Sequence, residues 1–173
     1  WNDRNNQKYL NTYFNKYKNI WHHGDYCEKT KNNGYIIYGR SDATLNAGGI
    51  RFGTAELYRV VENIENIIEC VAVEHSLHND TEVILFLKMI SGVKLNKHIK
   101  TLIKYEIRSN LSPKHVPSKM YEVKDIPKTK SGKIVELLIK NIINGNDVTN
   151  KNALANPDCL KEYENIYKEL KKE

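Results

Sequence analysis

The chain has 173 residues and a formal net charge of +6, from 27 lysines and arginines against 21 acidic residues. This length accommodates one compact domain with additional segments. No apolar run approaches the roughly 20 residues that cross a bilayer, and no secretory leader is visible. Cys27, Cys70 and Cys159 form no CxxC pair, which argues against a disulfide framework or a zinc knuckle, so we expect a cytoplasmic protein with no membrane association.

Residues 1–33 are polar and aromatic, without a helical or strand period strong enough to build a core. We expect a loop-rich segment that docks on another part of the protein. Asn33-Gly34 is a hairpin turn signal, and a short strand is predicted over 35–38. Two glycine-bearing segments follow, GRSD at 39–42 and AGGIRFG at 47–53.

A helix is predicted to open at Thr54, whose hydroxyl would cap it, with Glu56 in its first turn. Strands are predicted around 67–73 and 83–90, joined by a hairpin loop over 76–81. The second strand is apolar without alternation, as expected for a strand covered on both faces. The helical spacing predicts one buried face for the helix, formed by Leu57, Val60, Val61 and Ile64.

The second helix is predicted over about 95–109, since Pro113 and Pro117 prevent its continuation. A strand near 119–123 leads into the segment PKTKSGK at 127–133. A third helix follows and ends near Gly145, and a last helix begins at Asn156-Pro157 with a cap and a first-turn proline. The predicted buried positions are Leu95, Ile99, Leu102, Ile103 and Ile107, then Ile134, Leu138 and Ile142, then Leu160, Tyr163, Tyr167 and Leu170.

The order β, α, β, β, α, β, α predicts a small α+β module, a short sheet with helices packed against it. The basic charge alone fits nucleic acid, an anionic membrane surface or a nucleotide. A nucleic-acid module would alternate aromatic and basic residues on exposed strands. The predicted strands are apolar instead, which disfavours nucleic acid and leaves a non-catalytic interaction domain as the alternative to an enzyme.

The lysine-rich segment at 127–133 invites a phosphate interpretation because Ser-Gly-Lys lies between a strand and a helix. It is not a Walker P-loop, which needs a glycine where Pro127 stands and Ser or Thr where Ile134 stands. What remains is a glycine-hinged loop that presents one ammonium as a point charge. Taken alone, these seven residues are more often a solvated turn.

The loop over 39–53 is the second candidate. Its glycines permit close backbone approach to a ligand, and Arg40 and Arg51 are suited to holding phosphate or ribose, although surface arginines on a tight connection are the more common case. The third candidate is the segment HHGD at 22–25, in which Asp25 can accept both hydroxyls of a ribose. Its adjacent histidines point apart, which argues against a metal site.

Together and in this order, the motifs resemble the signature of the adenylate-forming superfamily, which comprises acyl-CoA synthetases, peptide-synthetase adenylation domains and luciferases. The superfamily shows Gly-Asp, then Gly-Arg-x-Asp with a Gly-x-Arg loop, then a Pro-(x)-Thr-x-Ser-Gly-Lys segment. This chain has GD at 24–25, GRSD at 39–42, GIR at 49–51 and PKTKSGK at 127–133. The hexapeptide SDATLN at 41–46 and the extension past Lys133 resemble the branch of acyl-CoA synthetases that acts on acetoacetate, with acetate or another short-chain acid as the alternative.

The resemblance implies nucleotide-binding roles for three residues. Asp25 would bind the ribose hydroxyls of the adenylate, Arg40 would contact ribose or phosphate, and Arg51 would hold phosphate. The implied cofactors are ATP, CoA and Mg²⁺, with the Mg²⁺ ligands expected outside this chain.

The other implied roles concern catalysis and motion. Lys133 would be the catalytic lysine of the adenylation step, and Asp42 would be the hinge about which a small domain rotates. Gly49 would line the pantetheine tunnel in the second step, and Lys104 takes the place where some relatives have an arginine for CoA.

The resemblance also implies how the chain is divided. Residues 1–41 would be the C-terminal end of a large adenylation domain, 42–150 a small mobile domain, and 151–173 a helical extension. The implied partners are the short-chain carboxylic acid, ATP, CoA and the missing large domain. We therefore expect the C-terminal part of an acid–CoA ligase that is inactive when isolated.

Overall fold

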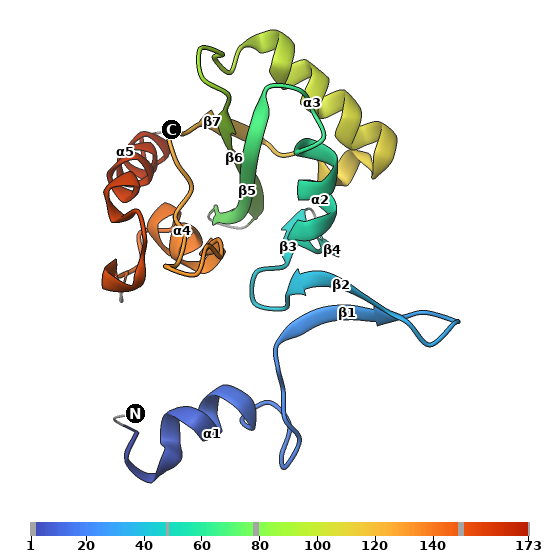
Figure 1. Cartoon of the computed structure of the whole chain (residues 1–173), viewed down its shortest axis with the longest axis vertical. Helices are drawn as coiled ribbons and strands as arrows, with labels where there is room; N and C mark the ends of the chain where they lie inside the picture. Colours follow the sequence, from blue (N-terminus) through green and yellow to red (C-terminus); the bar gives the residue numbers. More distant parts are fainter. Residues whose placement is uncertain (1–2, 48, 78–79, 149–150, 173) are drawn as a thin grey trace.

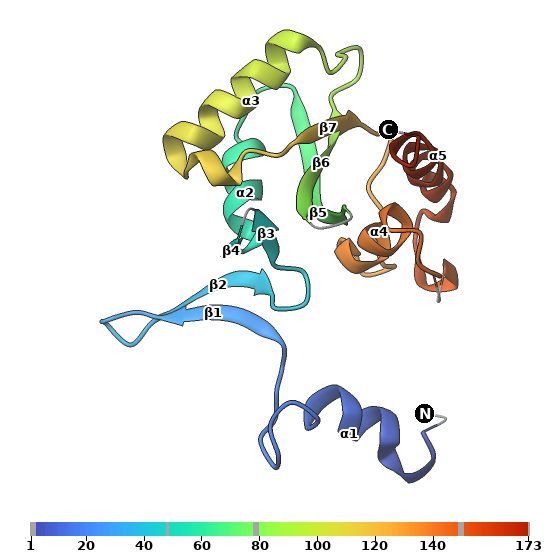
Figure 2. The same ribbon diagram turned by 180° about the vertical axis from the view of Figure 1, so that it is seen from behind.

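The computed structural model describes residues 3–47, 49–77, 80–148 and 151–172. A short sheet lies between two pairs of helices, and an N-terminal helix and hairpin extend away from this body, as two opposite views show (Figure 1, Figure 2). The predicted α+β module is confirmed.

The sheet consists of β5 (Ile67–Ser76), β6 (Thr81–Met89) and β7 (Lys119–Glu122). The central strand β6 is antiparallel to β5 and parallel to β7. Its residues alternate between two core clusters, with Val83, Leu85 and Leu87 in one and Ile84 and Phe86 in the other. Because side chains of a strand point alternately to the two faces, a wholly apolar strand fits a sheet covered on both sides, as the sequence predicted. In the predicted loop between β5 and β6, residues 78–79 lie outside the described residues.

One face of the sheet is covered by α2 (Thr54–Val61) and α3 (Lys97–Asn110). The predicted cap of α2 is wrong by one residue, because Gly53 is the cap and its N–H donates to Glu56 Oε1 at 3.3 Å. In α3 the stripe is confirmed at Ile99, Ile103 and Ile107, but Leu102 is 37% exposed. A 3-10 turn, η2 (Pro113–His115), follows α3.

The other face is covered by α4 (Glu136–Ile143) and α5 (Leu160–Leu170). Tyr163 of α5 is fully buried, and its ring centroid lies 5.0 Å from that of Phe86 in the sheet. The predicted extension is therefore a part of the second core cluster. The predicted Ile134 and Tyr167 are half-buried. Three further buried positions of these helices were missed: Ile139, Ile143 and Ile166.

The start of the last helix differs from the prediction. Pro157 does occupy the first turn, of a 3-10 segment η4 (Pro157–Cys159) that runs into α5, but the Asn156 side chain makes no capping hydrogen bond. It is directed to residues 125, 126 and 128 instead. Another 3-10 turn, η3 (Lys151–Ala153), lies just before it.

The N-terminal segment is more regular than predicted. It contains η1 (Arg4–Asn6), α1 (Gln7–Tyr13) and β1 (Asp25–Lys29), the last paired with β2 (Tyr35–Arg40) in an antiparallel hairpin. The predicted turn at Asn33-Gly34 is confirmed. A second small hairpin, β3 (Leu45–Ala47) and β4 (Ile50–Phe52), joins this segment to α2.

Very little of the N-terminal segment is buried: among described residues up to 41, only Gly24 falls in the buried class. The segment also exposes large apolar side chains, including Ile20 at 62%, Tyr35 at 66% and Ile37 at 53%. The body over 43–172, by contrast, contains both core clusters. The helix and hairpin at the N-terminus therefore have no core of their own within the described chain.

Candidate active-site residues

Asp25, Arg40 and Asp42 form one polar cluster where the β1–β2 hairpin meets the body. Asp25 and Arg40 are cross-strand partners, with Arg40 Nη1 4.0 Å from Asp25 Oδ1. The Arg40 guanidinium donates two hydrogen bonds to the Asp42 carboxylate, to Oδ1 at 3.2 Å and to Oδ2 at 3.1 Å. We call this two-point contact the Arg40–Asp42 fork. Hydrogen bonding to Asp42 raises the pKa of Arg40. The guanidinium also donates to the His23 carbonyl at 2.8 Å. Such a two-point contact fixes both side chains more firmly than a single ion pair.

Glycine is favoured beside this cluster by its backbone conformation. Gly24 has φ +91°, which other residues rarely adopt, and a Cβ built there would lie 2.8 Å from Arg40 Nη2, so the guanidinium would have to shift. The Gly24 carbonyl accepts from the Ser41 N–H at 2.8 Å, which closes the chain around the arginine. The Gly-Asp and Gly-Arg-x-Asp motifs, far apart in sequence, therefore meet in one place.

Gly49 and Arg51 lie on the second hairpin. Gly49 belongs to the turn between β3 and β4, with φ +83°, and a Cβ at this position would have no described atom within 4 Å, so the turn is open on this side. The hairpin is held to the sheet by Thr81, whose hydroxyl donates to the Asn46 carbonyl at 2.7 Å. Arg51 is exposed, and its side chain makes no hydrogen bond or ion pair with the described residues.

Lys133 closes a tight turn at the end of the PKTKSGK segment. Its N–H donates to Thr129 Oγ1 at 3.1 Å, its carbonyl accepts from the Thr129 N–H at 2.8 Å, and Gly132 between them has φ +83°. The Thr129 hydroxyl also contacts the Ser131 hydroxyl at 2.9 Å. The Lys133 side chain is exposed, and no described residue lies within ion-pair distance of its ammonium. The loop thus presents an uncompensated cation on an ordered backbone.

Lys104 lies on α3 beside a hollow of about 320 Å³ between this helix and β7. Lys100, Lys119 and Tyr121 also line this hollow. The Lys119 ammonium lies 3.4 Å from the Glu82 carboxylate, so Lys100 and Lys104 supply the cationic character that favours a polyanion here.

The structure gathers some of the predicted residues and leaves others apart. Asp25, Arg40 and Asp42 touch, whereas no hydrogen bond or ion pair among described residues links this cluster to Gly49, Lys104 or Lys133.

Several polar residues near these loops were missed by the motif search. The Tyr58 hydroxyl donates to Glu136 Oε1 at 2.6 Å and accepts from the Ala72 N–H at 3.1 Å, linking α2, α4 and β5. Asn156 and Asp125 hydrogen-bond each other at 2.5 Å beside the Lys133 loop. A tyrosine in a helix and an asparagine before a proline have no local signature for such roles, so only their tertiary partners reveal them.

Two further observations concern the described residues as a set. No group of three histidine, cysteine, aspartate or glutamate side chains among them is arranged to hold a metal ion. None of their helices is both long enough and apolar enough to cross a membrane.

Comparison with known proteins gives the chain its relatives. No protein-family model matches it. The fold matches that of an anthranilate CoA ligase solved in complex with anthranoyl-AMP, with TM-score 0.65 and 21% identity over 75% of this chain and 25% of that one. This likeness shows that the two chains share a fold.

The particular relatives are acetoacetyl-CoA synthetases. The chain is 48% identical to the acetoacetyl-coenzyme A synthetase of Rhizobium meliloti over 160 residues, 92% of this chain and 25% of that protein. The solved structure of acetoacetyl-CoA synthetase from Streptomyces lividans superposes with TM-score 0.90 and 34% identity, covering 98% of this chain and 26% of that one. The chain is thus similar to acetoacetyl-CoA synthetases along nearly all of its own length, and it spans about a quarter of the length of the relatives it matches.

Proposed function

We propose that the chain is the C-terminal part of an ATP-dependent acid–CoA ligase that converts acetoacetate to acetoacetyl-CoA, releasing AMP and diphosphate. The observation that carries the proposal is the exposed ammonium of Lys133, which makes no ion pair with the described residues and lies on an ordered loop, the last of three motifs in the superfamily's order. The similarity to acetoacetyl-CoA synthetases over 92% of the chain supports acetoacetate rather than acetate as the acid.

In the first step, the carboxylate of the acid attacks the α-phosphate of ATP and diphosphate leaves. Negative charge accumulates between the two reactants, and a fixed ammonium in a site that excludes water stabilises it as it develops. Lys133 supplies that ammonium. Mg²⁺, whose ligands we assign to the absent part of the protein, neutralises the departing diphosphate when bound.

In the second step, the CoA thiol attacks the acyl carbon and AMP leaves. The side occupied by the Lys133 loop must then be vacated, and a rotation of the small domain about Asp42 accomplishes this while bringing the Gly49 turn into place. The open turn at Gly49 suits a wall of the pantetheine tunnel, since a side chain there would project into the passage.

The Arg40–Asp42 fork gives this rotation a specific starting point. Asp42 is held by two hydrogen bonds from Arg40, so a change of backbone angles at 42 either breaks the fork or carries Arg40 along. Where the fork breaks, the Arg40 guanidinium becomes available to ribose or phosphate, and Asp25, its cross-strand partner, accepts the ribose hydroxyls beside it. Arg51, which lies on the body after residue 42, contacts phosphate.

The rotating unit in this proposal is the whole body after residue 42. Tyr58 connects α2, next to Arg51, with Glu136 of α4, next to Lys133. Because both loops are attached to one packed core, removing the lysine and inserting the Gly49 turn are one movement.

The N-terminal segment up to residue 41 is the edge of the large domain in this account. Its apolar side chains are exposed, for example Trp21 (48% exposed) and Ile37 (53% exposed), and such side chains need a partner surface. The chain spans about a quarter of the length of its relatives, and in this account the other three quarters supply that surface. The cationic hollow beside Lys104 is the place for the CoA phosphates.

The test is an assay of the complete protein and of this chain alone against acetate, acetoacetate and longer acids. We expect CoA- and ATP-dependent AMP formation from the complete protein, fastest with acetoacetate, and none from the isolated chain. Preference for another acid would overturn the substrate assignment. Activity of the isolated chain would contradict the proposal that it needs the rest of the protein for catalysis. Absence of any AMP formation by the complete protein would favour a non-catalytic domain.

A further inference from the structure

The Lys133 loop is paired with residues 153–155 just before η4. The Lys130 N–H donates to the Ala153 carbonyl at 3.3 Å, and the Ala155 N–H donates to the Lys128 carbonyl at 2.9 Å. Thr129, whose backbone and hydroxyl bind Lys133, forms the bridge with Leu154 between these two bonds. The extension therefore forms a short antiparallel β-bridge with the segment that carries the lysine.

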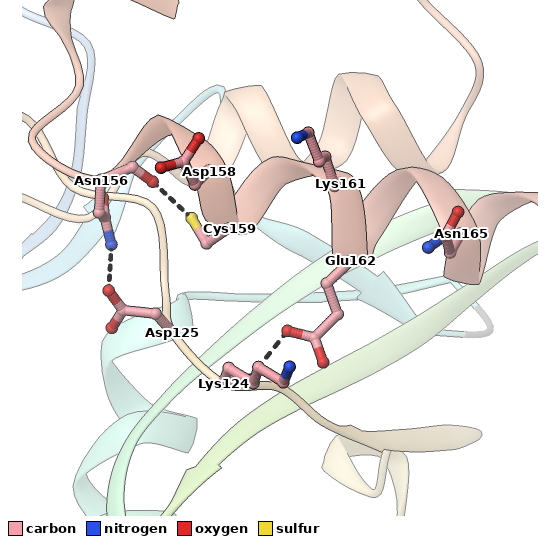
Figure 3. A pocket seen from close by; sticks show the side chains of 8 residues that line it. All are labelled: Lys124, Asp125, Asn156, Asp158, Cys159, Lys161, Glu162 and Asn165. Atoms are coloured by element: carbon pink, nitrogen blue, oxygen red, sulfur yellow. Dashed lines mark hydrogen bonds between the residues drawn. The ribbon is translucent and has the colours of Figure 1, made fainter.

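Asn156 locks this pairing with three hydrogen bonds from one amide. Its Oδ1 accepts from the Lys128 N–H at 2.9 Å, while its Nδ2 donates to Asp125 Oδ2 at 2.5 Å and to the Ile126 carbonyl at 2.8 Å. Figure 3 shows the amide and the Asp125 carboxylate pointing toward each other at one end of a cavity of about 560 Å³. These three hydrogen bonds use most of the hydrogen-bonding capacity of an asparagine amide.

The partners of Asn156 are themselves anchored to the sheet. Lys88 of β6 lies 2.6 Å from Asp125 Oδ1, and the Tyr163 hydroxyl donates to the Asp125 carbonyl at 3.1 Å. Lys128 makes an ion pair with Glu69 of β5 at 2.6 Å. A continuous set of contacts thus runs from the buried core through Asp125 and Asn156 to the base of the Lys133 loop.

We propose that Asn156 is a positioning residue for Lys133, and that the extension contributes to the adenylation step by fixing the lysine loop. The inference rests on the proposed role of Lys133. A mobile loop would spread the ammonium over many positions, and a displacement of about 1 Å at a reacting centre can cost about 100-fold in rate. The expected consequence is specific, because the second step does not use the lysine.

The first experiment measures hydrogen exchange on this chain. Asn156→Ala should increase exchange of the Lys130 and Ala155 amides by about tenfold or more, while amides of β6 stay protected. The control is Asn165→Ala, the same change on the wall of the same cavity, at an exposed residue whose side chain makes no hydrogen bond with the described residues. Unchanged exchange at both amides in Asn156→Ala would overturn the proposed anchoring.

The second experiment measures the two half-reactions of the complete protein. Asn156→Ala should slow adenylate formation about 10- to 100-fold through kcat and leave thiolation of preformed acyl-adenylate unchanged, and Asn165→Ala should change neither. If Lys133→Ala suppresses adenylation but Asn156→Ala does not, the positioning role is wrong. If Lys133→Ala leaves adenylation intact, the proposed function itself fails.

A second variant covers the case in which Asn156→Ala does not fold. Asn156→Asp keeps the acceptor for the Lys128 N–H but loses the two donated hydrogen bonds, to Asp125 Oδ2 and to the Ile126 carbonyl, and places a second carboxylate beside Asp125. It should slow adenylate formation about 10- to 100-fold and leave thiolation of preformed acyl-adenylate unchanged. A folded Asn156→Asp protein with a wild-type adenylation rate would contradict the proposal.

Discussion

The Tyr58 hydroxyl offers a sharp test of how the body is held together. The strand β5 is an edge of the sheet, and the N–H of Ala72 on that edge has Tyr58 Oη as its partner at 3.1 Å. The same hydroxyl donates to Glu136 Oε1 at 2.6 Å. Burial and the Glu136 carboxylate raise the pKa of Tyr58, so the phenol stays protonated and able to donate. The perturbation is Tyr58→Phe, which removes one oxygen and leaves the ring in place.

The magnitude follows from the groups left behind. Ala72 is 1% exposed, and an unsatisfied buried N–H costs about 1–3 kcal/mol. A hydrogen bond to a carboxylate contributes about 1.5–3 kcal/mol, although the exposed part of Glu136 regains water when the bond is lost. We therefore expect Tyr58→Phe to lower the free energy of unfolding by about 2 kcal/mol, which for a urea slope of about 2 kcal/mol per molar moves the midpoint down by about 1 M.

The assay is urea denaturation of this chain followed by far-ultraviolet circular dichroism. Tyr105→Phe is the matched control, because Tyr105 is 64% exposed and its hydroxyl makes no hydrogen bond with the described residues, and it should leave the midpoint unchanged. A double-mutant cycle with Glu136→Ala, which removes the acceptor, should give a coupling free energy of about 1 kcal/mol or more. Equal midpoints for wild type and Tyr58→Phe would refute the reasoning that this hydroxyl joins α2, α4 and β5.

Two other predictions concern titration and thiol chemistry. Burial lowers the pKa of His115, against a smaller opposing effect of Glu56. Because the unfolded chain then binds a proton more readily than the folded one, the free energy of unfolding should decrease as the pH falls from about 6.5. Denaturation midpoints measured at several pH values should show this decrease, with a flatter profile for His115→Gln. Cys27 is exposed, Cys159 has its pKa raised to about 11 by burial, and Cys70 is fully buried with a raised pKa. A thiol-reactive chromophore should therefore modify Cys27 first, Cys159 slowly and Cys70 only with unfolding, and rapid labelling of all three would contradict the described burial.

Local patterns predicted most of the body. The continuous apolar run in β6 predicted a strand between two layers, and the turn at Asn33-Gly34 was predicted from its dipeptide. These features depend on residues a few positions apart, whose effects on backbone and burial can be read from the chain directly.

Features that depend on distant partners were predicted less well. The sequence predicts a helix cap at Asn156, because asparagine before a proline is a common cap. The hydrogen-bond partners of its side chain instead lie 28 to 31 residues earlier in the chain. The Tyr58–Glu136 bond spans 78 residues. Helix α1 was missed because its apolar residues, such as Leu10 at 44% exposed, have no core in the described chain from which a period would arise.

The candidate site shows the same difference between features predicted from local patterns and features that depend on distant partners. The ordered motifs predicted which residues to examine, and the structure adds that Arg40 is committed to Asp42 while Lys133 makes no ion pair with the described residues. No sequence pattern distinguishes an arginine that is already paired from one that is free, since that depends on which carboxylates the fold brings near it.

The central claim is that Lys133 serves the adenylation step alone, and the half-reactions of Lys133→Ala in the complete protein test it most directly. Adenylate formation from acetoacetate and ATP should fall by at least about 100-fold, because a fixed charge at the transition state is lost. Thioester formation from preformed acetoacetyl-adenylate and CoA should proceed at the wild-type rate. Equal loss in both steps, or no loss in the first, would contradict the account.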